Sequence, residues 1–189
     1  SPGFRILSIL GGNTVSMNGL TISNGNATGN GGGILNQGTL TLTNSTLSVN
    51  SATNDGGGLH SSGAPVSISG STLSGNTAGR FAGAVFLSSA ATLRNCTVAG
   101  TTAPDTGGLG FDGGAPANLT NCSVAGNSNT AIVVAASSRP TSTLTLVNTL
   151  VAIPPGSLAI SVVVSLASSP NLIQGTPGFG TGGMVDGVD

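Results

Sequence analysis

Gly31-Gly32-Gly33-Ile34-Leu35-Asn36-Gln37-Gly38-Thr39-Leu40-Thr41-Leu42-Thr43-Asn44-Ser45-Thr46-Leu47-Ser48-Val49-Asn50 is one copy of a unit that recurs along the chain. Leu42 serves as the reference position of this unit. Its counterparts follow one another at 25, 26, 25, 26 and 27 residues, and the full set is Met17, Leu42, Ile68, Leu93, Leu119 and Leu146. A constant period of this length indicates structural units that bury their apolar faces only by stacking on one another.

Within one unit the pattern is that of β-strands. Leu40 and Leu42 alternate with threonines, and a period of two places apolar side chains on one face of a strand. A second apolar position follows five residues after the reference, at Ile22, Leu47, Leu73, Val98 and Val124. Because an odd spacing cannot keep one face of a straight strand, we predict a bend between the two positions. Residues that tolerate a left-handed backbone stand there, namely Asn44, Gly70, Asn95 and Asn121.

These features predict an all-β fold, a single-stranded parallel β-solenoid (β-helix) of about seven coils. Each coil has roughly 25 residues in three short strands that surround a column of aliphatic side chains. Residues 1–12 are expected to form an N-terminal strand and a possible assembly contact, residues 13–152 the regular repeats, and residues 153–189 a less regular C-terminal coil or cap. The 32 glycines argue against helices, where each would cost about 1 kcal/mol.

The composition argues against nucleic acid as a partner and against a membrane-spanning helix. The chain is 5% charged with a net charge of −1, so it has no basic patch for nucleic acid. The most apolar run, residues 158–166, is far shorter than the roughly 20 residues of a membrane helix, and a buried strand is expected there instead. All basic residues are Arg and all acidic residues are Asp, which suits an extracellular location. The start at Ser1 without an initiating Met suits a processed or excised segment.

The repeat resembles a known family. Residues 31–34 followed by residues 40–48 resemble the unit of right-handed parallel β-helix proteins of bacterial surfaces, in particular polymorphic outer-membrane-protein-like repeats, over about residues 13–150. Residues 170–179 are similar to the segment that ends such domains. The resemblance implies a right-handed coil and a role as a surface-exposed stalk, adhesin or passenger domain.

Two cysteines occupy equivalent places in neighbouring units. Cys96 and Cys122 each stand three residues after the reference position. Stacked coils lie about 4.8 Å apart, a Cα separation within the range of a disulfide. We therefore expect a disulfide between them, with two reduced thiols as the alternative.

A charged column is expected at one corner. Asp55, Arg80 and Asp105 follow one another at intervals of 25 residues, so they should stack as an acid–base–acid ladder. A structural role is the first interpretation, and a polar site for a sugar or a cation is the second. Asp105 and Asp112 could also form a calcium site or a hydrolase pair, although the sequence lacks a repeated calcium-binding pattern or a dense Asp cluster. His60 has no obvious partner, and a surface or satisfied loop position is expected.

The leading hypothesis is a non-enzymatic extracellular structural protein, without cofactor, metal or catalytic residues. It would be a rigid stalk or a filament subunit that associates end to end through apolar residues near both ends, namely Phe4, Ile6, Leu7, Ile9, Leu10, Ile160, Val162 and Val164. The alternative is an adhesin or carbohydrate-binding module that recognises a surface glycan through Ser, Thr and Asn ladders. A third hypothesis is a polysaccharide lyase or hydrolase, against which stands the scatter of Arg5, Arg80, Arg94 and Arg139.

Overall fold

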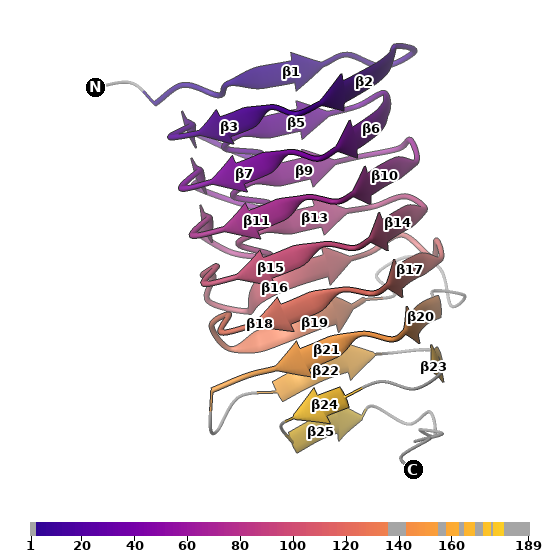
Figure 1. Ribbon diagram of the computed structural model, residues 1–189. Helices are drawn as coiled ribbons and strands as arrows, with labels where there is room; N and C mark the ends of the chain where they lie inside the picture. The colour runs from indigo at the N-terminus through magenta and orange to yellow at the C-terminus, as the bar shows by residue number, and fades with distance from the viewer. Residues whose placement is uncertain are drawn as a thin grey trace.

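A computed structural model of the 189-residue chain describes residues 3–135, 143–154, 158–162, 165–168, 172–174 and 176–179. Every regular element in these ranges is a β-strand, and the strands wind into a parallel solenoid (Figure 1). The predicted all-β solenoid is therefore confirmed. Predicted contact residue Val164 lies outside the described residues, as does Arg139.

The strands form four parallel sheets that run along the solenoid. Sheet A contains β1 (Leu7–Ile9), β5 (Ile34–Asn36), β9 (Leu59–Ser61), β13 (Val85–Leu87), β16 (Thr106–Phe111), β19 (Thr130–Val134), β22 (Leu158–Val162) and β25 (Thr176–Phe179). Sheet B contains β2 (Thr14–Asn18), β6 (Thr39–Thr43), β10 (Val66–Ser69), β14 (Ala91–Arg94), β17 (Ala117–Thr120), β20 (Thr143–Val147) and β23 (Ser165–Ser168). Sheet C contains β3 (Thr21–Ser23), β7 (Thr46–Ser48), β11 (Thr72–Ser74), β15 (Thr97–Ala99), β18 (Ser123–Ala125), β21 (Leu150–Ala152) and β24 (Leu172–Gln174). Sheet D contains β4 (Asn26–Ala27), β8 (Ser51–Ala52) and β12 (Thr77–Ala78). Sheet D adds a fourth, very short strand to the three expected in a coil.

The two apolar columns predicted from the repeat stack in register. The reference position pairs across sheet B from Met17 through to Leu146. The second apolar position pairs across sheet C from Ile22 to Val124. Their side chains lie in one buried core, which only the first coil leaves partly uncovered.

The bend between sheets B and C is formed as expected. Asn44, Asn95 and Asn121 have φ values of 47°, 53° and 53°, and Gly70 has 58°. The glycine triplets serve close packing between coils. A Cβ atom on Gly32 would lie 2.2 Å from the carbonyl oxygen of Ser51, so any side chain there would collide with backbone.

The predicted number of coils was too high. About five turns are regular, and they lie within the continuous described stretch 3–135. Strand pairing continues beyond them, but the spacing departs from 25: Leu150 pairs with Leu172, and Leu158 pairs with Thr176. The apolar run at residues 158–166 is likewise divided between β22 and β23, which belong to different sheets. A shorter spacing leaves less chain for corners, so these coils cannot repeat the earlier cross-section.

A ladder of buried polar side chains accompanies the apolar core. Asn50 and Asn76 are fully buried in consecutive coils. Asn76 Oδ1 accepts hydrogen bonds from the backbone N–H of Asn50 at 2.9 Å and from its Nδ2 at 3.0 Å. Asn76 Nδ2 donates to the carbonyl of Leu47 at 2.9 Å. Asn127 continues the same pattern with Thr101 and Val98. These amides satisfy backbone groups at a corner where strand pairing stops.

Candidate functional site

A charged column lies at one corner of the solenoid. Arg80 Nε donates to Asp55 Oδ1 at 2.9 Å and Arg80 Nη2 reaches Asp55 Oδ2 at 2.5 Å, which makes a two-pronged ion pair between consecutive coils. The hydrogen bond and charge of Asp55 raise the pKa of Arg80, and Asp105 raises it further. Within the described residues Arg80 forms its ion pair with Asp55 and not with Asp105. The predicted ladder is therefore confirmed for its first two members.

Arg5 extends this column by one more coil. Its Nε donates to the carbonyl of Gly31 at 2.9 Å and its Nη2 to the carbonyl of Asn30 at 2.7 Å. Asn30 Oδ1 in turn accepts from the N–H of Asp55 at 3.2 Å. From the sequence, Arg5 is one of four arginines expected not to converge on one site. The missed signal was its spacing, because Arg5, Asn30 and Asp55 also follow one another at 25 residues.

His60 was expected at the surface or in a satisfied loop, and this prediction was wrong. It lies in β9 with only 7% of its surface exposed, and its Nδ1 has no hydrogen-bond partner. Its ring stacks on Phe86 in the next coil, with ring centres 5.5 Å apart and planes at 13°. Burial lowers the pKa of His60, and Arg5 and Arg80 lower it further while Asp55 opposes them.

A hollow opens on the outer face of sheet A next to this stack. It holds about 340 Å³ of empty space, part of it open to solvent, and its walls include Phe81, Phe86, Phe111 and Val133. Thr106 also lines it; this side chain is 1% exposed and its hydroxyl oxygen has no hydrogen-bond partner. The hollow is thus apolar, with an unsatisfied polar atom in its wall. Nothing in the sequence analysis predicted it.

Cys96 and Cys122 stack in consecutive coils as expected, but they are free, buried thiols and not the expected disulfide. Each Sγ faces the carbonyl two residues earlier, Arg94 at 3.2 Å and Thr120 at 3.4 Å. Ser45 and Ser71 bond in the same way to Thr43 and Ser69. In-register stacking places the four side chains at equivalent positions of neighbouring coils, each directed at its own carbonyl. A hydrogen bond from the Cys122 thiol lowers the pKa of Cys96 to about 7, and the same bond with burial raises that of Cys122.

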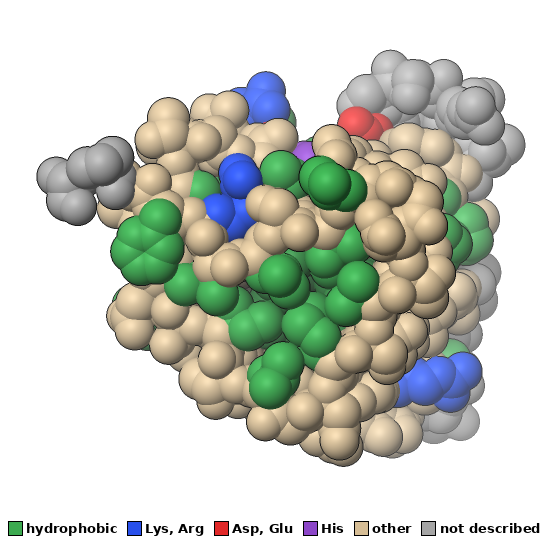
Figure 2. All heavy atoms as spheres, turned by 90° about the horizontal axis from the view of Figure 1, so that it is seen from above, with side chains coloured by type: hydrophobic (Ala, Val, Ile, Leu, Met, Phe, Trp, Pro, Cys, Tyr) green, Lys and Arg blue, Asp and Glu red, His purple; other side chains and the backbone are tan. Residues whose placement is uncertain are grey.

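The first described coil exposes apolar side chains at the N-terminal end of the solenoid. Seen from that end, hydrophobic side chains gather in the middle of the face (Figure 2). Phe4, Ile6 and Leu10 are exposed, whereas Leu7 is partly buried and packs against the core. Two other predicted contact residues, Ile9 and Ile160, are instead buried in the core. Ile9 is two residues after Leu7 in β1, so strand alternation turns both toward the interior.

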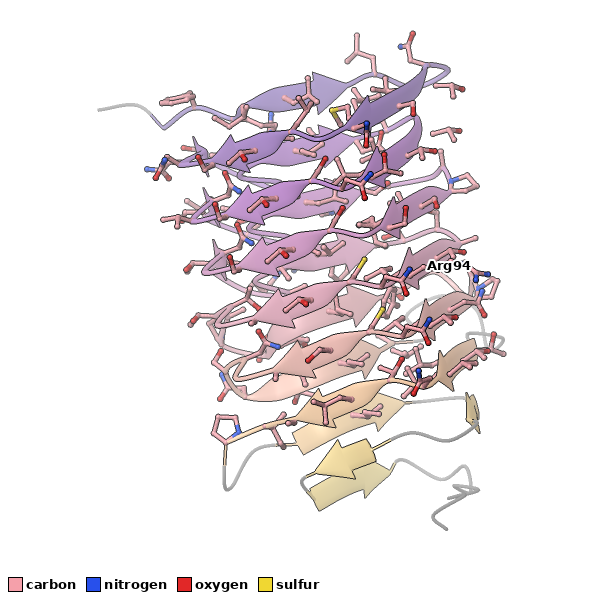
Figure 3. All side chains as sticks on the ribbon, viewed as in Figure 1. Arg94 is labelled. Atoms are coloured by element: carbon pink, nitrogen blue, oxygen red, sulfur yellow. The ribbon has the colours of Figure 1, made fainter. Side chains whose placement is uncertain are left out.

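The outer faces of sheets B and C carry columns of small polar side chains (Figure 3). In sheet C, Thr21, Thr46, Thr72, Thr97 and Ser123 are paired in register. In sheet B one such column is Ser16, Thr41, Ser67, Thr92, Asn118 and Thr145. Arg94 projects from the end of β14 beside these columns and is exposed (Figure 3).

The described part of the chain contains no cluster of three or more His, Cys, Asp or Glu side chains that could hold a metal ion. It likewise contains no helix long and apolar enough to cross a membrane. Asp105 and Asp112 are therefore not members of a carboxylate cluster among these residues. The weak calcium interpretation finds no support in this geometry.

Comparison with known proteins identifies the architecture. The family model described as "Right handed beta helix region" matches residues 5–160. The chain belongs to this right-handed β-helix family. Searches of curated proteins and of solved structures each found no match. The expected right-handed coil is therefore confirmed, and the bacterial-surface identity suggested by the resemblance stays a prediction.

Proposed function

We propose that this β-helix is a non-enzymatic extracellular structural unit, a rigid spacer or filament subunit whose N-terminal edge associates with another copy of the chain. The observation that carries the proposal is the open N-terminal coil. Among the described strands, β1, β2 and β3 each pair on one side only, with β5, β6 and β7. Their other edges leave backbone N–H and C=O groups available for a further strand.

The side chains at this edge favour association. Natural sheets protect free edges with charged residues, prolines or a covering segment. Here Ile6 and Leu10 are exposed, and Leu7, Val15 and Met17 are only partly buried. The cation of this region, Arg5, points its guanidinium at the carbonyls of Asn30 and Gly31 in the second coil. Another coil laid on this edge would bury apolar surface and complete the strand ladders.

Electron microscopy of the purified chain at several concentrations tests this proposal, together with sedimentation velocity. Concentration-dependent rods, with an axial repeat near the length of one solenoid, are the expected result. Discrete dimers would mean that the N-terminal edges of two chains pair with each other and that assembly stops there. This result would overturn the filament form of the proposal. Monomers at every concentration would overturn self-association altogether.

A matched pair of variants locates the contact. The double substitution Ile6→Lys and Leu10→Lys places two charges on exposed positions of the N-terminal edge and should abolish association. The control, Thr92→Lys with Asn118→Lys, places the same charges on the outer face of sheet B and should leave association unchanged. Equal loss in both would point to a general effect of charge and not to the edge.

The second candidate function is carbohydrate binding, favoured by the in-register hydroxyl columns on sheets B and C. Hydroxyl groups repeat about every 4.8 Å along such columns, a spacing set by strand pairing. Arg94 adds a positive charge beside Thr92 and Thr120, which favours an acidic polysaccharide. Binding to immobilised uronic-acid polysaccharide that Arg94→Gln weakens would support this function. Binding that Arg94→Gln leaves unchanged would argue against it.

A further inference from the structure

Cys96 and Cys122 belong to a column of buried polar side chains inside the bend between sheets B and C. The column passes through consecutive coils, and its members are Ser45, Ser71, Cys96, Cys122 and Thr149. Cys96 Sγ lies 3.2 Å from the carbonyl oxygen of Arg94. Cys122 Sγ lies 3.4 Å from the carbonyl oxygen of Thr120 in the same arrangement. Because both thiols make the same contact on stacked coils, the two sulfur atoms are separated by about the coil spacing, roughly 4–5 Å.

This separation is too long for a disulfide and suits an ion held between the two sulfur atoms. A disulfide needs a sulfur–sulfur distance of about 2.05 Å, so both side chains would have to leave their carbonyls. A cation bonded to two sulfurs in a line needs twice the metal–sulfur distance. At roughly 2.3 Å per bond, the value for a thiolate on zinc, that separation is about 4.6 Å. Stacking in register therefore already provides the spacing of a two-coordinate site.

The carbonyl groups beside the sulfurs do not depend on the thiol protons. The carbonyl of Arg94 also accepts from the N–H of Gly70 at 2.9 Å. The carbonyl of Thr120 accepts from the N–H of Asn95 at 3.0 Å. Both carbonyls keep a hydrogen-bond partner when a metal ion replaces a thiol proton, so binding leaves no buried backbone group unpaired.

Backbone N–H groups are directed at the sulfur atoms. The N–H of Ser71 donates to the sulfur of Cys96, and the N–H of Cys96 donates to the sulfur of Cys122. The N–H of Cys122 continues the pattern by donating to the hydroxyl of Thr149 at 3.4 Å. Hydrogen bonds of this kind stabilise the negative charge of a sulfur that has lost its proton to a metal ion.

The number and type of ligands restrict the ion. Within the described residues no third His, Cys, Asp or Glu side chain joins the two cysteines. Structural zinc takes four ligands, whereas thiolate sulfur also selects Cu(I), a soft cation. Cys96 is 2% exposed and Cys122 is 4% exposed, so burial favours a neutral complex. A monovalent ion bound to one thiolate and one thiol is neutral.

We propose that Cys96 and Cys122 bind one cuprous ion, Cu(I), in a two-coordinate site inside the bend between sheets B and C. Binding forms two copper–sulfur bonds, breaks one S–H bond and releases that proton to solvent, with no change of oxidation state. The ion links two consecutive coils. Because both thiols are buried, loading of the native chain is slow.

Titration of the full chain with Cu(I), free of oxygen and in competition with a chelator of known Cu(I) affinity, tests the proposal after long equilibration. One ion per chain is expected, together with a higher urea midpoint for the loaded chain, because an ion that binds the folded state stabilises it. Ag⁺, which is also soft and monovalent, should displace Cu(I), and Zn²⁺ should not. Two ions per chain, no binding, or displacement by Zn²⁺ would overturn the proposal.

Serine variants remove one ligand at a time. Ser45 and Ser71 fill the equivalent positions and bond to the carbonyl two residues earlier, so Cys96→Ser and Cys122→Ser should keep the fold. Either substitution should weaken Cu(I) binding more than about 100-fold, because even the outer partners of metal ligands are worth about 10–100-fold. Unchanged affinity in either variant would mean that each thiol binds alone and would overturn the two-sulfur site.

A matched pair of double variants tests whether stacking creates the site. Ser71→Cys with Cys122→Ser leaves two cysteines on consecutive coils, at positions 71 and 96, and should bind Cu(I) like the natural chain. Ser45→Cys with Cys96→Ser leaves them three coils apart, at positions 45 and 122, and should bind as weakly as the single serine variants. Far-ultraviolet circular dichroism checks that each variant is folded. Equal binding by the two double variants would overturn the proposal.

Discussion

Asn76→Ala is the substitution whose effect the structure allows us to estimate best. Asn76 is fully buried, and its Oδ1 accepts from the backbone N–H and from the Nδ2 of Asn50. Its own Nδ2 donates to the carbonyl of Leu47. Alanine would leave the N–H of Asn50 without this acceptor inside the solenoid and would remove two further hydrogen bonds, from Asn50 Nδ2 and to the carbonyl of Leu47. A buried group that loses its partner costs about 1–3 kcal/mol, so we expect a total loss of about 2–4 kcal/mol.

Urea unfolding followed by far-ultraviolet circular dichroism measures this loss, since the chain has no Trp or Tyr for fluorescence. One-dimensional NMR of the methyl groups supplies a second probe of the same transition. The control is Asn118→Ala, a half-exposed position on the outer face of β17, which should change the free energy of unfolding by no more than about 0.5 kcal/mol. A loss below about 0.5 kcal/mol for Asn76→Ala would refute the idea that the asparagine ladder satisfies otherwise unpaired groups.

Three further outcomes are expected. Because burial lowers the pKa of His60 below 6.5, the unfolded chain binds a proton there before the folded chain does. The free energy of unfolding should therefore fall as the pH drops below about 6.5, and His60→Phe should flatten this dependence between pH 5 and pH 6.5, roughly the interval in which His titrates. Thiol titration without reductant should find Cys96 and Cys122 slow to react in the native state and both reactive after unfolding. If no thiol reacts even after unfolding, the two cysteines form a disulfide and the expectation of free thiols is wrong. Gly32→Ala should destabilise the fold by about 1–3 kcal/mol or more through collision with backbone. Its control, Gly11→Ala, has an ordinary 3.7 Å contact and should be tolerated.

The charged corner illustrates how far periodicity predicts a site. The spacing of 25 residues correctly placed Arg80 above Asp55, because parallel in-register coils bring equivalent positions into contact. The same spacing could have placed Arg5 and Asn30 in that column. It could not predict whether Arg80 would pair with Asp55 or with Asp105. That depends on the direction of a long side chain and on the near-complete burial of Asp55.

The hollow on sheet A shows what periodicity could not predict. Gly110 reads in the sequence as one more glycine of a Gly-rich segment, and only the register places it between Phe86 and Val133, with the Phe86 ring packed over it. The buried state of His60 and the unpartnered hydroxyl of Thr106 depend likewise on what the neighbouring coils place around them.

From the repeat alone came the all-β solenoid, the two stacked apolar columns and the Asn or Gly corners, because these follow from a local period and local backbone preferences that every coil shares. Tertiary structure decided the state of the cysteines, the division of the last coils, the burial of Ile9 and Ile160, and the hollow beside Phe86. The physical reason is that these depend on side-chain direction and on the places where a coil differs from its neighbours. A period describes what the coils have in common, and the hollow arises where one coil departs from it.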